Sequence, residues 1–185
     1  MCIRDRDYDD AQTLIDLIGK KMVPVLQKDD GSIMAESLDI IAYFMDLKSS
    51  DEQRVPSEQV TLFQSRAFPL SQRIGLPRWW KLDLAEYQSE ASKAAWRAAK
   101  ETEELNFDKL IEQTPQFVEQ INPLLKDAEL LLNLENGEST LPFIDQAVYF
   151  SMLRGFCVEP SITWPPALER WLEKQSETLK LSLLR

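Results

Sequence analysis

Residues 19–40 read GKKMVPVLQKDDGSIMAESLDI. Two apolar runs, residues 22–27 and 33–35, flank a polar segment whose Asp-Asp-Gly sequence is typical of a tight turn. This pattern predicts a β-hairpin. Because proline cannot donate a hydrogen bond to a sheet ladder, Pro24 must lie at a strand start, at a bulge or at a sheet edge.

Helical periodicity flanks the predicted hairpin. Apolar residues recur at helical spacing from about Asp9 to Gly19, and glycine commonly ends a helix in the left-handed conformation. Downstream, Ser37 is a favourable N-cap for a second helix. A two-stranded hairpin is marginally stable by itself, so for residues 1–48 this arrangement predicts either that part of a domain is missing or that another chain supplies it.

Residues 49–56 are mostly polar and predict a linker. The patterns in residues 57–185 are helical, which predicts an all-helical domain large enough to hold its own core. Thr114 is expected to be the N-cap of one of its helices, with Pro115 at the first helical position. The predicted helices are a segment from Ser57 that is interrupted at Pro69, and residues 85–100, 114–131, 143–154 and 168–179.

Composition excludes several classes of function. The 185 residues carry 21 basic and 31 acidic side chains and no histidine, for a net charge of −10. The acidic balance argues against nucleic-acid and anionic-membrane partners. Without histidine the chain cannot carry Ser-His or Cys-His catalysis or a His-rich metal site, and no other spacing suggests a metal. The start of the chain is too charged for a secretory signal, so we expect a cytoplasmic protein.

Two short motifs could together hold a peptide-like ligand. A cis peptide bond at Val23–Pro24 would leave the backbone of Val23 free to pair with such a ligand in the manner of a strand. Glu36 and Ser37 stand where the second strand gives way to a helix, whose first-turn N–H groups favour a carboxylate. A zwitterionic amino-acid end could place its carboxylate there and its ammonium on Glu36. The alternatives are an edge-strand proline and an ordinary helix start.

These motifs carry a family resemblance. The stretch VPVLQKDD with the following Glu36-Ser37, and ITWP at residues 162–165, resemble the glutathione-transferase superfamily and most closely the glutaredoxin 2 family. The resemblance implies an α/β thioredoxin-like N-terminal domain, incomplete here, followed by an all-α glutathione-transferase-like C-terminal domain. It also implies that Pro24 is a cis-proline, that Val23 pairs with the cysteinyl part of glutathione, and that Glu36 and Ser37 hold the γ-glutamyl end. Pro142 departs from the superfamily, which usually has a Ser or Thr cap three residues before Asp145.

The chemistry implied by the resemblance is glutathione-dependent thiol–disulfide exchange on disulfide-containing proteins, with glutathione as co-substrate and no metal. Members of the family begin with a Cys-x-x-Cys segment, whereas the cysteines here are Cys2 and Cys157, and Cys157 is expected to be buried and unreactive. We therefore expect an N-terminally truncated glutaredoxin 2-like protein without a catalytic residue, inactive as given. The alternatives are a cysteine-free binding or scaffold protein and a glutathione transferase with a hydroxyl nucleophile.

Overall fold

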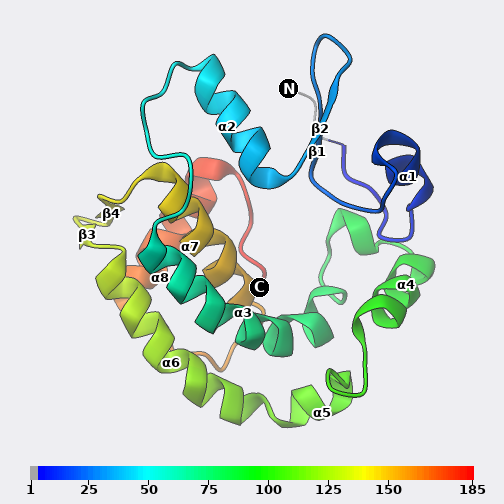
Figure 1. Ribbon diagram of the computed structural model, residues 1–185. Helices are drawn as coiled ribbons and strands as arrows, with labels where there is room; N and C mark the ends of the chain where they lie inside the picture. The colour runs from blue at the N-terminus through cyan, green and yellow to red at the C-terminus, as the bar shows by residue number, and fades with distance from the viewer. Residues whose placement is uncertain (1–3) are drawn as a thin grey trace.

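The N-terminal part of the chain is a hairpin between two helices (Figure 1). The computed structural model describes residues 4–185, so Cys2 lies outside the described residues. The strands pair antiparallel with Leu26 opposite Met34, and the first helix ends at Gly19 with a φ of 77°, as the sequence predicted. The elements of this part are α1 (Gln12–Ile18), β1 (Val25–Gln27), β2 (Ile33–Ala35) and α2 (Ser37–Leu47).

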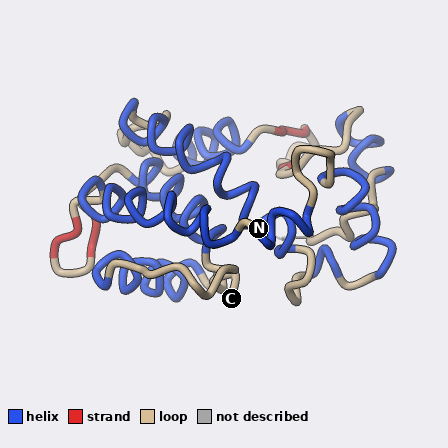
Figure 2. The backbone as a smooth tube through the Cα atoms, turned by 90° about the horizontal axis from the view of Figure 1, so that it is seen from below, coloured by secondary structure: helices blue, strands red, loops and turns tan. Residues whose placement is uncertain are grey.

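The rest of the chain is mostly helical. Helix α3 packs against α5, α6 and α7, and α8 covers α6 and α7. Figure 2 shows the long helices lying side by side. The elements are α3 (Glu58–Trp79), the 3₁₀ helix η1 (Ala85–Tyr87), α4 (Glu90–Lys100), α5 (Phe107–Glu112), α6 (Thr114–Leu131), β3 (Leu134–Glu135), β4 (Glu138–Ser139), α7 (Phe143–Phe156) and α8 (Pro166–Leu179).

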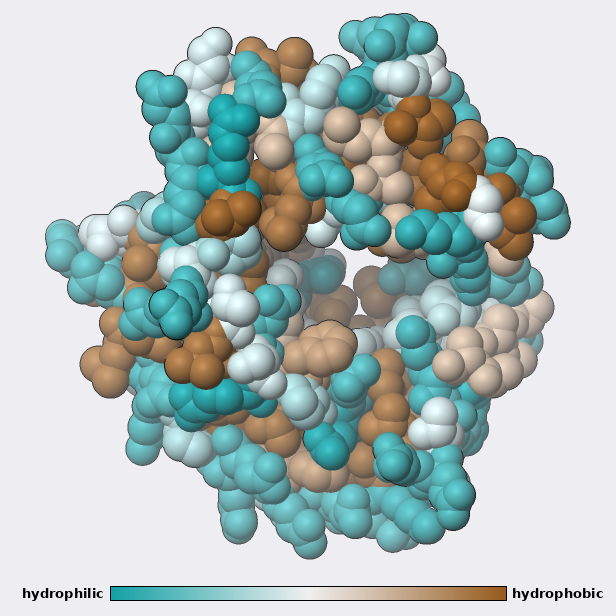
Figure 3. Space-filling model, viewed as in Figure 1, coloured by the Kyte–Doolittle hydropathy of each residue, from teal (hydrophilic) through white to brown (hydrophobic). Residues whose placement is uncertain are grey.

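The main hydrophobic core lies within the helical domain. Its buried members run from Val60 to Leu172, while the buried apolar side chains in residues 4–57 are Leu14 and Met45. Figure 3 shows an opening in this face of the molecule, between the hairpin with α2 and the helices below them. The N-terminal part therefore takes little stability from packing. No helix within residues 4–185 is both long and apolar enough to cross a membrane.

Helix α3 runs unbroken through Pro69 and Pro77, so the predicted interruption at Pro69 is wrong. A proline inside a helix removes one backbone hydrogen bond and costs about 3 kcal/mol or more. Ala67 and Leu70, on either side of Pro69, are buried along the stripe that α3 turns toward the core. Burial of this stripe against three helices offsets the local cost, because tertiary packing overrides propensity.

Three predicted helix starts are corrected by the structure. Ser37 is the first residue of α2, and Glu36 is its N-cap. Likewise Gln113, not Thr114, occupies the N-cap position of α6, and its side chain makes no cap hydrogen bond. The Thr114 hydroxyl donates to the Leu110 carbonyl at 3.3 Å and accepts from the Arg78 guanidinium at 2.6 Å. The helix expected over residues 85–100 is divided, with η1 preceding α4.

Two elements of the helical domain were not predicted. One is the short helix α5, which the Asn106 side chain caps by accepting a hydrogen bond from the Lys109 N–H. The other is the β3–β4 hairpin, so the domain is mostly rather than entirely helical. Its turn residues, Asn136 and Gly137, both have positive φ, which suits the two-residue turns of tight hairpins.

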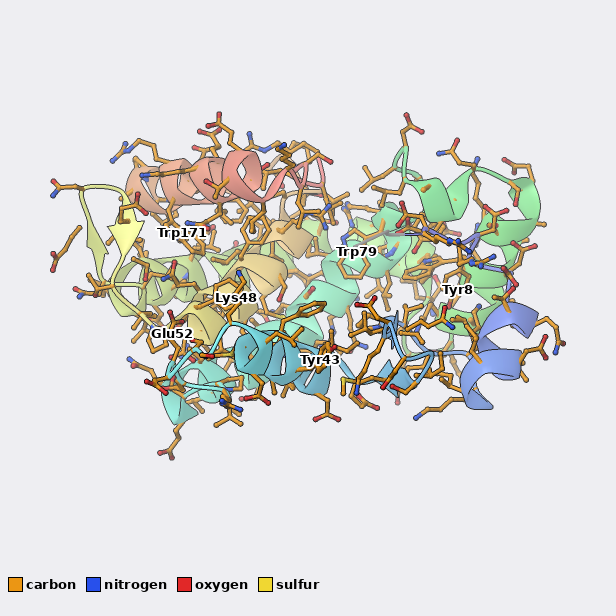
Figure 4. All side chains as sticks on the ribbon, turned by 90° about the horizontal axis from the view of Figure 1, so that it is seen from above. Tyr8, Tyr43, Lys48, Glu52, Trp79 and Trp171 are labelled. Atoms are coloured by element: carbon orange, nitrogen blue, oxygen red, sulfur yellow. The ribbon has the colours of Figure 1, made fainter. Side chains whose placement is uncertain are left out.

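Contacts around Tyr8 and around Asp145 join residues 4–57 to the helices. The Tyr8 ring lies 5.0 Å from that of Trp96, and Asp9 accepts a 2.6 Å hydrogen bond from the Ser92 hydroxyl. In Figure 4, Tyr8 lies beside α4 and α1, far from Trp171, which is enclosed by the long helices. The second set joins Gln53 and Ser57 to α7.

Asp145 of α7 forms the contact at the linker. Its buried carboxylate accepts a 2.8 Å hydrogen bond from the Ser57 N–H and a 3.3 Å bond from the Gln53 side chain. Pro142 is the N-cap of α7 and supplies no side-chain cap, but its carbonyl accepts from the Asp145 N–H at 3.1 Å. The helix that the sequence placed here therefore forms without the usual hydroxyl cap.

Helices α3 and α7 approach each other closely around Trp79. The Trp79 indole N–H donates to the Gly155 carbonyl at 3.0 Å. The ring also lies against Gly75, one turn earlier in α3, where an added Cβ atom would stand 2.0 Å from it. The absence of a side chain at Gly75 is thus what lets Trp79 lie flat on its own helix.

Candidate functional site

Val23 and Pro24 lie immediately before β1. Their peptide bond is cis, as the family resemblance implied. The β1–β2 ladder begins at Val25, and within residues 4–185 no backbone hydrogen bond involves Val23. The Val23 side chain is exposed at 68%. Its N–H and C=O are therefore available to a ligand that approaches the hairpin as an extended strand.

Glu36 and Ser37 lie at the start of α2. Glu36 has a φ of 76° and a ψ of 122°, an unusual conformation for a non-glycine residue that costs of order 1–3 kcal/mol. Although Glu36 is the N-cap, its side chain does not cap the helix, and no other side chain of residues 4–185 hydrogen-bonds to this first turn. The first-turn N–H groups thus remain open, together with the partial positive charge of the helix end.

The hairpin register brings these two motifs together. Val25 is paired with Ala35, so Val23, two residues before the ladder, and Glu36, just after it, lie at the same end of the hairpin. Ser37 follows directly. The four residues predicted from the sequence thus occupy one end of one small element, with open backbone groups on one strand and an uncapped helix start after the other.

The structure adds Lys20 to this group. Its ammonium lies 3.9 Å from the Glu36 carboxylate, and both side chains are mostly exposed. Neighbouring lysines are engaged elsewhere, because Lys21 lies 3.7 Å from the centre of the Tyr8 ring and Lys28 lies over Tyr43. Sequence analysis did not single out Lys20, because no residue pattern relates it to Glu36, 16 positions later.

Cys157 lies at the end of α7 and is only 5% exposed, as predicted. Its thiol donates to the Leu153 carbonyl at 3.6 Å, and burial raises the pKa of this thiol to about 11. Since the thiolate is the reactive form, Cys157 is unsuited to attack a disulfide at neutral pH. In the part of the chain described, no three His, Cys, Asp or Glu side chains gather as a metal site.

The candidate site is an open surface rather than an enclosed pocket. Two hollows elsewhere have volumes of about 240 and 300 Å³. The first lies among residues 5–10 and Ala85, and the second lies between α3 and α6. Neither includes Val23 or Glu36. Because Val23, Lys20 and Glu36 are mostly exposed, a ligand at the hairpin end would be held by backbone pairing and charge.

Two family models match the chain. The model described as "Glutaredoxin 2, C terminal domain" matches residues 59–185, and that described as "Glutathione S-transferase, N-terminal domain" matches residues 3–52. Glutaredoxin 2 of Escherichia coli strain K12 is 28% identical over 182 residues, which cover 95% of this chain and 82% of the relative. Glutaredoxin 2 of Escherichia coli O157:H7 gives the same values.

A solved structure resembles the whole fold. The crystal structure of glutaredoxin 2 from Salmonella typhimurium in complex with glutathione has a TM-score of 0.83 and 25% sequence identity. The match covers 96% of this chain and 82% of that chain. Together with the family models, it confirms the predicted fold class, a thioredoxin-like N-terminal part followed by a mostly helical domain of the glutathione-transferase type.

Proposed function

Since this chain belongs to the glutaredoxin 2 family, we propose that it binds glutathione at the end of its β1–β2 hairpin, and that an intact form carrying a Cys-x-x-Cys segment catalyses glutathione-dependent thiol–disulfide exchange. Its partners would be glutathione and disulfide-containing proteins of the cytoplasm. In this proposal residues 1–48 bind glutathione, residues 49–56 link the two domains, and residues 57–185 form the helical domain. The relative from Salmonella typhimurium, whose solved structure contains glutathione, supports the choice of ligand.

The proposed binding mode uses the groups that the fold leaves open. The Val23 N–H and C=O pair with the cysteinyl residue of glutathione as one strand pairs with another. The γ-glutamyl α-carboxylate lies on the first-turn N–H groups of α2 and on the Ser37 hydroxyl, and the γ-glutamyl ammonium faces Glu36. The observation that carries this proposal is the convergence of Val23, Glu36 and Ser37 at one end of the hairpin.

Thiol–disulfide exchange needs an attacking thiolate. That thiolate forms a bond to one sulfur of the disulfide, and the other sulfur leaves as a new thiolate; glutathione thiolate then displaces the protein thiol from the mixed disulfide. The 185 residues contain no Cys-x-x-Cys pair, and the buried thiol of Cys157 is poorly suited to this role. For this chain the proposal therefore concerns the binding of the glutathione moiety.

A paired substitution tests the binding mode. Glu36→Ala should weaken the binding of reduced glutathione about tenfold, because it removes a charge-assisted hydrogen bond to the ammonium. Asp39→Ala removes a carboxylate from the same helix turn and should change the affinity less than twofold. Both affinities can be measured with the 185-residue chain by NMR titration. Equal losses in the two variants would count against the γ-glutamyl assignment, and a wild-type chain that does not bind would refute the proposed function.

A further inference from the structure

Lys20 and Glu36 are brought face to face by the fold. The chain turns at Gly19, which ends α1 in the left-handed conformation, and the next residue extends toward the junction of β2 and α2. The 3.9 Å between the Lys20 ammonium and the Glu36 carboxylate is too long for a hydrogen bond. The two charges therefore attract each other without being locked together.

Both side chains are free to receive a ligand. The Lys20 side chain is 61% exposed and that of Glu36 is 63% exposed, so little is lost when they separate. A zwitterionic amino-acid end has an ammonium and a carboxylate on one carbon atom. Set between Glu36 and Lys20, it would produce an alternating row of charges, with each ligand group facing an opposite charge on the protein.

A ligand carboxylate at the start of α2 needs a nearby cationic side chain of the protein, because the acidic residues there repel it. Glu36 and Asp39 are both acidic, and each repels a carboxylate that approaches the first-turn N–H groups. The partial charge of the helix end, about half an elementary unit, does not offset two carboxylates. Lys21 and Lys28 lie against aromatic rings, which leaves Lys20 as the lysine of this segment that faces Glu36.

We propose that Lys20 is a specificity-determining residue that contacts the γ-glutamyl α-carboxylate of glutathione while Glu36 holds the adjacent ammonium. This inference rests on the proposed function and names the chemistry that its γ-glutamyl subsite selects, an unmodified α-amino acid end. Lys20 contacts the carboxylate, and Glu36 contacts the ammonium group. A ligand that lacks its carboxylate offers no partner to Lys20, and one that lacks its ammonium offers none to Glu36.

The test compares two lysine variants and three ligands by NMR titration of the 185-residue chain. Lys20→Met should weaken the binding of reduced glutathione about fivefold at low salt, the expected size for an exposed pair of charges. Lys48→Met is the matched control, since Lys48 caps the far end of α2 (Figure 4), and it should leave the affinity unchanged. In 1 M salt, where the Debye length is about 3 Å, the effect of Lys20→Met should shrink.

The ligands identify which carboxylate Lys20 contacts. Glutathione amidated at the γ-glutamyl α-carboxylate should bind wild type and Lys20→Met equally, whereas the glycine ethyl ester of glutathione should keep the fivefold difference. The opposite pattern would assign Lys20 to the glycine end and overturn the inference. If both variants bind glutathione as wild type does, the role of Lys20 is refuted while the proposed function stands. Absence of binding to wild type would refute the proposed function itself.

Discussion

The contact between Trp79 and Gly75 predicts the sign of the change in the free energy of unfolding when Gly75 is replaced by alanine. Replacing an ordinary helical glycine by alanine stabilises a protein by about 0.5–1 kcal/mol, since alanine is the better helix former. At Gly75 the new Cβ would stand 2.0 Å from the Trp79 ring, so the ring must move. Its displacement forfeits the hydrogen bond to the Gly155 carbonyl, worth about 1 kcal/mol, and the crowding adds about 1–3 kcal/mol.

Gly75→Ala should therefore lower the free energy of unfolding by about 1–3 kcal/mol once the gain in helix propensity is subtracted. The measurement is urea unfolding followed by circular dichroism at 222 nm. Gly155→Ala is the matched control, because its Cβ would lie 3.2 Å from the Ser71 hydroxyl and 3.3 Å from the Trp79 ring, a tight but adjustable contact. It should remain within about 1 kcal/mol of wild type.

A double-mutant cycle separates crowding from other effects of the alanine. In a Trp79→Ala background the ring is gone, so Gly75→Ala should become stabilising by up to about 1 kcal/mol. The sign should thus reverse between the two backgrounds. If Gly75→Ala proved as stable as wild type, the Trp79 ring would be free to move, and the close approach of α3 and α7 would not depend on the missing side chain.

Two further predictions concern stability across the chain. Burial raises the pKa of Cys157 from 9.0 to about 11. The contribution of the buried neutral thiol to the free energy of unfolding is therefore complete below pH 9 and is lost as the pH rises toward 11. Over that window the free energy of unfolding of wild type should fall relative to that of Cys157→Ala, and parallel urea-unfolding profiles would contradict this. Because the core cluster begins at Val60, limited proteolysis should cut residues 4–56 well before the helical domain, and uniform resistance along the chain would argue against two unequal parts.

The hairpin and its flanking helices could be predicted because their signals are local. The Asp-Asp-Gly turn and the helix-ending Gly19 each fix the conformation of neighbouring residues without distant help. The β3–β4 hairpin carried a local signal too, in Asn136 and Gly137. Its strands are only two residues long, so the alternation of apolar and polar residues that would have supported the signal is absent.

The errors arose where distant residues decide local structure. Pro69 lies within a helix because the face on which Ala67 and Leu70 lie is buried by three other helices. The hydroxyl of Thr114 is available as a cap in the sequence, but Arg78, 36 residues earlier, takes it in the structure. Neither the helices that bury this face of α3 nor the Arg78 side chain that bonds to Thr114 can be identified from the neighbouring sequence.

The residues of the candidate site that the hairpin brings together could be predicted from the sequence, and Lys20 could not. The pairing of β1 with β2 brings Val23, Glu36 and Ser37 together, and the sequence already indicated that hairpin. The approach of Lys20 to Glu36 depends on the direction in which the chain leaves Gly19, which no residue pattern encodes. Lys20 therefore became visible only in three dimensions.

The carboxylate of Asp145 has a mechanical consequence for the linker. Because it accepts hydrogen bonds from both Gln53 and Ser57, the last linker residues are fastened to α7 and move with the helices. At its other end this segment is held to α2, because the Ser49 N–H donates to the Asp46 carbonyl and the Ser50 N–H to the Met45 carbonyl, both at 3.0 Å. Only a few residues lie between these two attachments, so a force that pulls α2 away from the helices would soon act on the hydrogen bonds of the buried Asp145 carboxylate.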